Sequence, residues 1–188
     1  MGSDLCSRST AARDIYRLAA DVLDCDLLSL DDGELAQTRY AQLSIVTMSL
    51  AAWAAFQAED DDLPAQAFAG FSLGEYTVLG AAGVLELPDL LKLVRERARL
   101  MQAASDAVPG AMYAVMGLDE ASLLEVVGRP GFENKVFAVN FNSPGQTVIA
   151  GLAAETELCT HELGAAGARK IRKLNVSGAF HTPLMRPA

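Results

Sequence analysis

The feature that most constrains the fold of this chain is the pentapeptide Gly70-Phe71-Ser72-Leu73-Gly74. It fits the pattern G-x-S-x-G, in which a serine occupies a strained turn between a strand and a helix and the glycines avoid steric clashes. The apolar stretch 65–69 predicts the strand, and the pattern from about residue 75 predicts the helix. Ser72 is therefore a candidate nucleophile, and the backbone N–H of Leu73 at the helix N-terminus is a candidate oxyanion donor.

A serine nucleophile needs a base, and the chain contains two histidines, His161 and His181. His161 lies in a predicted helix, where a surface position is a sufficient explanation. His181 lies in a predicted loop after a strand, and loops on a rigid scaffold often carry catalytic groups. An imidazole also suits a group that must accept a proton and return it near neutral pH. His181 is therefore the candidate general base.

The segment 87–107 predicts an amphipathic helix with Arg97 in the middle of its apolar face. The other members of that face are Leu87, Leu90, Leu91, Leu93, Val94, Ala98, Leu100 and Met101. A guanidinium among apolar side chains must be paired, since an uncompensated buried charge is costly. Spacing alone favours a carboxylate of the protein as the partner. The alternative is that the guanidinium is left for the carboxylate of a substrate.

The first half of the chain is predicted to be helical and the second half mixed. Good helix formers with apolar residues at helical spacing predict helices at 11–28 and 40–57, followed by an exposed acidic loop at 59–64. The later strands are predicted at 111–116, 135–140, 147–151 and 168–176, with helices at 119–127 and 153–163. This βαββαβ order matches the ferredoxin-like motif. We therefore expect an α/β fold in which a small subdomain, 109–177, is inserted into a larger unit formed by 1–108 and 178–188.

The amino-acid composition of the chain limits the kinds of molecule that it can be expected to bind. With 15 Lys+Arg against 24 Asp+Glu, a net charge of −9 argues against a broad nucleic-acid surface. The cysteines Cys6, Cys25 and Cys159 are widely spaced and not grouped with histidines, so we expect reduced thiols and no metal site. No uninterrupted apolar run reaches the ~18 residues that span a bilayer, and no targeting segment is evident. We expect a soluble cytoplasmic protein that needs neither a metal nor an organic cofactor and binds no membrane.

Several motifs, read together, resemble one enzyme family. In chain order they are Gly70-Phe71-Ser72-Leu73-Gly74-Glu75-Tyr76, Arg97 with Met101-Gln102, Asn140-Phe141-Asn142-Ser143-Pro144-Gly145-Gln146, and Ala179-Phe180-His181 with Pro183-Leu184-Met185. The segment from Thr38 to Gln42 also looks like the family's threonine and glutamine segment ahead of its first long core helix. The set resembles the malonyl-CoA:acyl carrier protein transacylases of fatty-acid and polyketide biosynthesis. The resemblance covers nearly the whole chain and implies a hydrolase-like large subdomain with a ferredoxin-like small one.

The resemblance also implies a ping-pong acyl transfer with malonyl-CoA and acyl carrier protein as partners. Ser72 would attack the malonyl thioester with help from His181, and the phosphopantetheine thiol of the carrier protein would collect the malonyl group. Arg97 matches the family arginine that pairs with the malonyl carboxylate, which reverses the expectation from spacing alone. The implied substrate-binding residues are Arg97, Leu73, Met101, Asn140, Asn142 and Phe180.

Two of these implied roles carry qualifications. Asn140 and Asn142 lie in a stretch that borders the family's cleft, and hydrogen bonding at a turn or strand end explains them equally well. The ring of Phe180 resembles the version found in malonyl-selective transferases. A bulky ring there would leave little room for an α-methyl branch on the acyl group.

The sequence departs from the family pattern in three places. Phe71 stands beside the nucleophile where the family usually has histidine. The family's opening strand and its glutamine-bearing oxyanion loop have no counterpart before Asp4, and the family continues well past Ala188. We therefore expect this chain to be either part of a longer enzyme or a degraded reading frame.

Two other functions stay open. An α/β-hydrolase esterase or thioesterase would use the same serine and histidine but would give no reason for Arg97. A non-catalytic fragment that keeps coenzyme A affinity would not need Ser72. The one dense basic cluster, formed by Arg169, Lys170, Arg172 and Lys173, is either a solvated strand edge or a docking surface for an acidic carrier protein.

Overall fold

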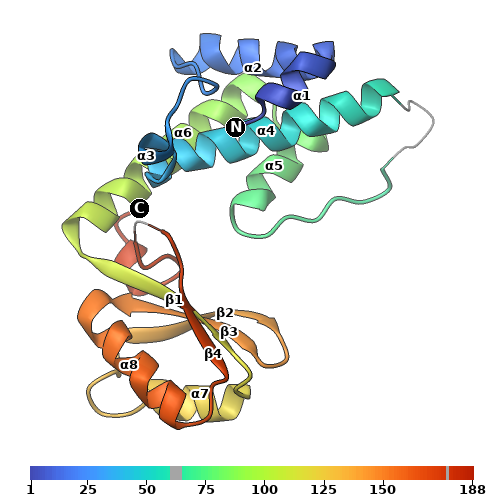
Figure 1. The fold of residues 1–188 in the computed structure, drawn as a ribbon. Helices are drawn as coiled ribbons and strands as arrows, with labels where there is room; N and C mark the ends of the chain where they lie inside the picture. Colours follow the sequence, from blue (N-terminus) through green and yellow to red (C-terminus); the bar gives the residue numbers. More distant parts are fainter. Residues whose placement is uncertain (60–64, 177) are drawn as a thin grey trace. The chain divides into compact units, whose positions relative to one another are not determined.

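The computed structural model describes residues 1–59, 65–176 and 178–188 and has the α/β fold that the sequence predicts (Figure 1). The predicted acidic loop falls largely on residues 60–64, outside the described residues. The chain forms two compact units, Met1–Arg99 and Leu100–Ala188. The described elements of the first unit are helices, and the second unit holds a four-stranded antiparallel sheet.

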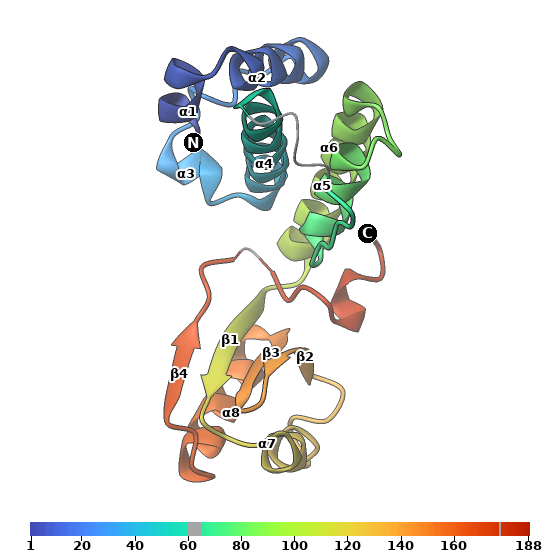
Figure 2. The same ribbon diagram turned by 90° about the vertical axis from the view of Figure 1, so that its right-hand side faces the viewer.

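The first unit is a helical assembly around one apolar core. Its elements are α1 (Ser3–Arg8), α2 (Thr10–Leu23), α3 (Asp32–Leu35), α4 (Thr38–Glu59), α5 (Leu73–Ala81) and the larger part of α6 (Leu87–Ala107). Val46 of α4 and Leu90 of α6 are fully buried in that core. α5 lies against α6, where Gly80 approaches Leu90 (Figure 2). The predicted helix at 40–57 is confirmed, and the predicted helix at 11–28 ends earlier, at Leu23.

Helix α4 is long and apolar enough to cross a membrane by length and composition alone. The core helices of soluble proteins pass the same test, and 44% of the relevant window is buried inside the protein. Leu43, Val46 and Leu50 of α4 belong to the apolar core. Packing in the core therefore accounts for one face of this helix, while Ile45, Met48 and Phe56 are exposed.

The predicted strand at 65–69 is wrong. Residues 65–71 adopt no regular secondary structure and are exposed to solvent. A β-strand exists only by pairing with a neighbour, because its N–H and C=O groups point sideways out of the chain. All the strands that the structure describes lie in the sheet of the second unit, so this segment has no described strand to pair with.

The second unit follows the predicted order of strand, helix, strand, strand, helix, strand. Its elements are β1 (Gly110–Met116), α7 (Glu120–Val127), β2 (Val136–Ser143), β3 (Gln146–Leu152), α8 (Ala153–Ala165) and β4 (Lys170–Lys173), followed by the short 3-10 helix Pro183–Met185. The sheet order is β2-β3-β1-β4, and every neighbouring pair is antiparallel. The predicted strand 168–176 is shorter than expected because only four of its residues pair with β1.

Helices α7 and α8 cover one face of this sheet (Figure 1). Leu123 of α7 and Leu163 of α8 are fully buried against Ile149 of the central strand β3. The opposite face packs against the C-terminal segment through Ala179 and partly buried Phe180. The sheet therefore has an apolar layer on each side, one formed by helices and one formed by the segment that carries His181.

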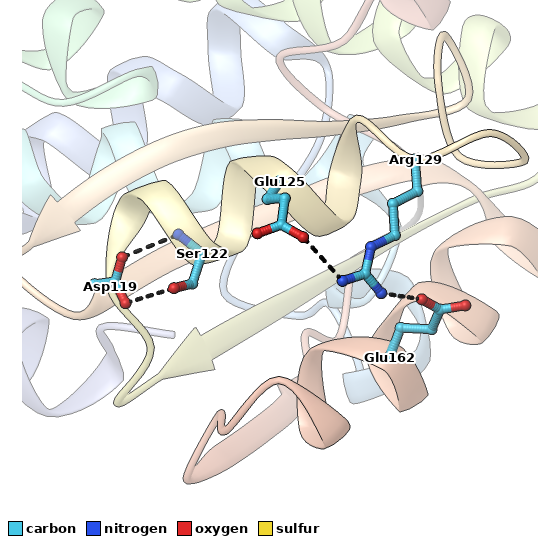
Figure 3. Close-up of polar contacts among 5 residues, drawn as sticks. All are labelled: Asp119, Ser122, Glu125, Arg129 and Glu162. Carbon is cyan, nitrogen blue, oxygen red and sulfur yellow. Dashed lines mark hydrogen bonds and ion pairs between the residues drawn. The ribbon is translucent and has the colours of Figure 1, made fainter.

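Polar contacts at the surface order the two helices (Figure 3). The carboxylate of Asp119 accepts a hydrogen bond from the Ser122 amide over 2.9 Å and caps α7. The guanidinium of Arg129 pairs with Glu125 over 3.2 Å and with Glu162 of α8 over 2.6 Å. Because these groups are exposed or half-exposed, the ion pairs add little free energy; they link the C-terminal end of α7 to α8.

Candidate active site

Ser72 occupies a strained backbone conformation immediately before α5. Its φ is 51° and its ψ is −107°, a combination outside the regions that non-glycine residues ordinarily adopt. The Gly74 amide donates to the Phe71 carbonyl over 2.8 Å, and the Glu75 amide donates to the Ser72 carbonyl over 3.2 Å. The Ser72 side chain makes no capping hydrogen bond. The turn thus fixes the Ser72 backbone, and the Ser72 side chain takes no part in capping α5.

The close approach of two backbone segments requires glycine at position 70. A Cβ on Gly70 would lie 2.2 Å from the carbonyl carbon and oxygen of Gly74 and 2.5 Å from the Glu75 nitrogen. Such a contact cannot exist without moving the backbone. A Cβ on Gly74, in contrast, would meet no atom within 4 Å. The expectation that both glycines avoid clashes is therefore confirmed for Gly70 and wrong for Gly74.

The backbone amide of Leu73 is placed to act as an oxyanion donor. As the first residue of α5 it has no carbonyl of a preceding helical turn to bond to. Within the described part of the chain its N–H donates to no backbone carbonyl, whereas the next two amides are used in the turn. The Leu73 side chain packs against the core of the first unit. A fixed N–H beside a serine hydroxyl has the chemistry that an oxyanion donor needs, so Leu73 stays a candidate for that role.

Arg97 is half-buried on α6, and both of its recorded partners are neutral. Its Nη1 donates to the Oε1 of Gln42, and its guanidinium carbon lies 5.1 Å from the centroid of the Tyr76 ring. Among the described residues, no carboxylate lies within ion-pair distance of Arg97. The internal carboxylate partner that spacing alone favours is therefore not found. Two side chains that sequence reasoning did not assign to the site, Gln42 and Tyr76, take its place.

The apolar face predicted around Arg97 is largely confirmed. Leu90, Leu91, Val94 and Ala98 are completely buried. The prediction is wrong for Leu93, which is 46% exposed. Leu93 projects from the edge of the apolar stripe, where a helix passes from its packed face to its solvent face.

His181 also has a left-handed backbone, with φ at 63°. The hydroxyl of Thr182 donates to the Ala179 carbonyl over 2.7 Å and closes the turn around the histidine. Before that turn, a Cβ on Gly178 would lie only 2.1 Å from the Oγ of Ser105, so the chain passes very close to α6 there. These contacts order the backbone on both sides of His181 and leave the residue itself exposed. The other histidine, His161, is exposed on α8, as expected.

Ser72, Leu73 and Arg97 lie in the first unit. The other predicted site residues lie in the second. Asn140 pairs with Val148 across the sheet, and Val148 belongs to the apolar cluster against which Phe180 packs. Asn140 and Phe180 are therefore brought to the face of the sheet that α7 and α8 do not cover. Met101 is half-buried on α6, and its carbonyl accepts from the Ser105 hydroxyl over 2.9 Å.

The two asparagines in β2 differ in exposure. Asn140 is half-buried and Asn142 is exposed, next to an irregularity in the pairing of β2 with β3. Neither side chain makes a hydrogen bond with another described residue. Among the described residues, this end of β2 is held by backbone pairing and not by the side-chain amides of the two asparagines.

The three thiols are poor candidates for a nucleophile. Burial raises the pKa of Cys159 to about 11, and burial is also the main cause that raises the pKa of Cys6 and of Cys25. The thiolate is the reactive form of cysteine, and little of it exists near neutral pH when the pKa is raised. The described residues include no group of three or more His, Cys, Asp or Glu that could hold a metal ion.

A family model described as an acyl transferase domain matches residues 1–188. The chain belongs to the acyl transferase family. Within that family it is 38% identical to the malonyl CoA-acyl carrier protein transacylase of Haemophilus influenzae over 192 residues, which cover 100% of this chain and 62% of the relative. It is also 38% identical to the enzyme of the same name from Bacillus subtilis, with 100% of this chain and 60% of the relative covered.

Solved structures give the same picture. The malonyl CoA-acyl carrier protein transacylase of Coxiella burnetii superposes with a TM-score of 0.92 at 31% identity, covering 100% of this chain and 60% of that one. A malonyl-transacylase in complex with a type II polyketide synthase acyl-carrier protein superposes with a TM-score of 0.87 at 37% identity, covering 100% and 62%. This acyl transferase chain thus spans about three fifths of the length of the relatives it matches.

The geometry of the Ser72 turn predicts that a side chain at position 70 reduces the reactivity of Ser72 in this acyl transferase. In Gly70→Ala the new Cβ would clash with backbone atoms, and the turn can relieve the clash only by moving Ser72 out of its positive φ. We expect the rate of Ser72 labelling by a fluorophosphonate probe to fall roughly tenfold or more, because attack geometry tolerates little displacement. Gly74→Ala is the matched control and should label within about twofold of the unmutated chain. Equal labelling of the Gly70→Ala variant would contradict the steric argument.

Proposed function

We propose that this chain carries the nucleophile and acyl-binding residues of an [acyl-carrier-protein] S-malonyltransferase of fatty-acid or polyketide biosynthesis. The reaction would move a malonyl group from malonyl-CoA to the phosphopantetheine thiol of acyl carrier protein. The observation that carries the proposal is the Ser72 turn together with Arg97, a cation whose recorded partners are neutral. The turn supplies a nucleophile, and the cation supplies a counter-charge for an acyl group that ends in a carboxylate. An esterase would need only the first.

The reaction has two balanced halves. The Oγ of Ser72 attacks the thioester carbonyl while His181 removes its proton, and the Leu73 N–H stabilises the oxyanion that forms. The C–S bond then breaks, and coenzyme A leaves with the proton that His181 returns. In the second half the phosphopantetheine thiol loses its proton to His181 and attacks the malonyl ester, and Ser72 recovers its proton as the leaving group.

The other predicted residues would shape the acyl site. Arg97 would bind the free malonyl carboxylate with two charge-assisted hydrogen bonds, which are stronger than neutral ones. The ring of Phe180 would restrict the space beside the acyl α-carbon. Asn140 and Asn142 would offer amide groups to the substrate, and Met101 would contribute an adaptable apolar wall.

We also propose an architecture in which a ferredoxin-like small subdomain, 109–177, is inserted into a hydrolase-like large subdomain formed by 1–108 and 178–188. The order βαββαβ and the sheet order β2-β3-β1-β4 support the first part of this proposal. The turn at Ser72 supports the second, since G-x-S-x-G turns are typical of hydrolase-like folds. We further propose a cytoplasmic location, in keeping with free thiols at all three cysteines.

The proposal predicts a covalent intermediate on Ser72. After brief incubation with malonyl-CoA, intact-protein mass spectrometry should detect one malonyl adduct on the unmutated chain and none on Ser72→Ala, because that variant lacks the attacking oxygen. Ser49→Ala, at an exposed position of α4, is the control and should keep the adduct. An adduct on Ser72→Ala would exclude Ser72 as the nucleophile, and no adduct on any form would show that this chain alone does not carry out the first half-reaction.

The proposed role of Arg97 predicts that the chain is selective for acyl groups that carry a carboxylate. In Arg97→Ala the rate of acylation by malonyl-CoA should fall roughly a hundredfold, since two charge-assisted hydrogen bonds are lost. Acylation by acetyl-CoA, which lacks the carboxylate, should change only about twofold. Arg95→Ala, an exposed arginine on the same helix, is the control. Equal losses on the two substrates would mean that Arg97 has a structural role only.

The basic cluster supports a role in docking the carrier protein. Lys170, Arg172 and Lys173 are exposed along β4, an edge strand of the sheet, and exposed Arg169 immediately precedes it. Lys170 and Arg172 pair with Met116 and Ala114, on the face without helices. Lys173 lies over the Tyr113 ring, 5.8 Å from its centroid, on the other face. None of the four makes an ion pair with a described residue, so their charge is available to an acidic partner.

Charge reversal on β4 tests this docking role. The double variant Lys170→Glu with Arg172→Glu should slow transfer to acyl carrier protein roughly tenfold at low salt, because it removes electrostatic steering of an acidic partner. Transfer to free pantetheine, which has no protein surface, should be unaffected. Arg8→Glu with Arg17→Glu gives the same charge change on exposed helices of the first unit and should have little effect. Equal losses with both acceptors would argue against docking through β4.

A further inference from the structure

A chain of side-chain hydrogen bonds leads from α4 to Arg97. Within α4, the Nε2 of Gln42 donates to the Oγ1 of Thr38 over 2.9 Å. The Oε1 of the same amide accepts from the Nη1 of Arg97. Thr38 is 7% exposed and Gln42 is 5% exposed, so the link is shielded from water. Both ends of the Gln42 amide are thus engaged, one by buried Thr38 and the other by half-buried Arg97.

The orientation of the Gln42 amide follows from the chemistry of its partners. A guanidinium can only donate hydrogen bonds, so the amide oxygen must face Arg97. The amide nitrogen then needs an acceptor, and the hydroxyl oxygen of Thr38 provides one. Thr38 therefore sets the direction of the amide, and the amide sets the position of the Arg97 guanidinium.

Tyr76 provides the third contact. The guanidinium carbon lies 5.1 Å from the centroid of its ring, within the range of a cation–π interaction. Tyr76 lies on α5, one helical turn after Ser72. The guanidinium is therefore held between a side chain of α4 and a side chain of the helix that begins at the nucleophile.

The side chains of Thr38, Gln42 and Tyr76, which support Arg97, are all uncharged. Their neutrality is what leaves the charge of Arg97 uncompensated. A buried arginine in a structural role is ordinarily neutralised by a carboxylate, which would bind it bidentately and compete with any anionic ligand. An amide oxygen and an aromatic face stabilise the cation but leave its full charge. Arg97 makes only one recorded hydrogen bond, through Nη1, with the described residues. The arrangement orders the guanidinium without satisfying its preference for a carboxylate.

We propose that Gln42 is a positioning residue that, with Thr38 and Tyr76, holds Arg97 as an uncompensated cation and thereby determines selectivity for acyl groups ending in a carboxylate. This inference rests on the proposed function, in which Arg97 binds the malonyl carboxylate. On this inference, the preference for acyl groups with a carboxylate depends on an uncharged side chain at position 42 as well as on Arg97. An acidic side chain at position 42 should act as an internal substitute for the substrate carboxylate.

The test is Gln42→Glu, which has nearly the same shape and adds one negative charge. The ratio of malonyl to acetyl acylation of Ser72, measured by intact-protein mass spectrometry, should fall at least tenfold. Gln57→Glu makes the same change at an exposed position of the same helix and should leave the ratio unchanged. In an Arg97→Ala background, Gln42→Glu should have almost no further effect on the ratio, because the two residues act as a unit. An unchanged ratio in Gln42→Glu, on a chain that does load malonyl, would overturn the inference and leave the proposed function intact.

A second measurement does not depend on activity. In the chain labelled with ¹⁵N at arginine, restricted rotation should give Arg97 separate guanidinium Nη–H resonances, identified by their loss in Arg97→Lys. Those resonances should collapse in Gln42→Ala and persist in Gln57→Ala. Thr38→Val, which frees the amide to turn, should weaken them. Resonances unaffected by Gln42→Ala would overturn the positioning role even if the chain showed no acylation at all.

Discussion

The contact between the backbones of Gly70 and Gly74 is the constraint on which the Ser72 turn depends. No side chain fits between the two segments, so the chain must reverse within four residues, and Ser72 takes up the strain with a positive φ. A conformation of this kind costs of order 1–3 kcal/mol and persists only where the surroundings enforce it. The same reversal starts α5 and frees the Leu73 N–H. One steric contact therefore accounts for both the strained conformation of half-buried Ser72 and the Leu73 N–H that the turn does not use.

His181 depends on a comparable device in the second unit. The close approach of Gly178 to Ser105 and the hydrogen bond from Thr182 to Ala179 leave the intervening backbone few conformations. Of the described non-glycine residues, Asp24, Ser72, Asn134 and His181 have positive φ. Aspartate, asparagine and histidine adopt such values more readily than serine does. The strain at Ser72 is thus the more unusual, as expected for a residue whose position matters for its chemistry.

The sequence predicted local structure well and contacts between distant segments poorly. The βαββαβ order and the helix Leu87–Ala107 follow from periodicity, which reports on residues a few positions apart. The strand at 65–69 was wrong because a strand needs a pairing partner that a local pattern does not reveal. The partner of Arg97 was missed because Gln42 lies 55 positions away on another helix. Its signal, one of several buried polar residues in α4, has meaning only once the contact between Gln42 and Arg97 of α6 is known.

The identity of that partner matters because the free energy of a buried cation depends on what it has already bound. In a low dielectric environment an ion pair within the protein would satisfy Arg97 and remove most of its attraction for a second anion. A neutral amide and a ring face offset only part of the desolvation cost of the cation. If Arg97 binds a carboxylate as proposed, stability of the unliganded protein and affinity for the ligand would be opposed at this position. The amide of Gln42, buried beside Thr38, would then order the cation without neutralising it.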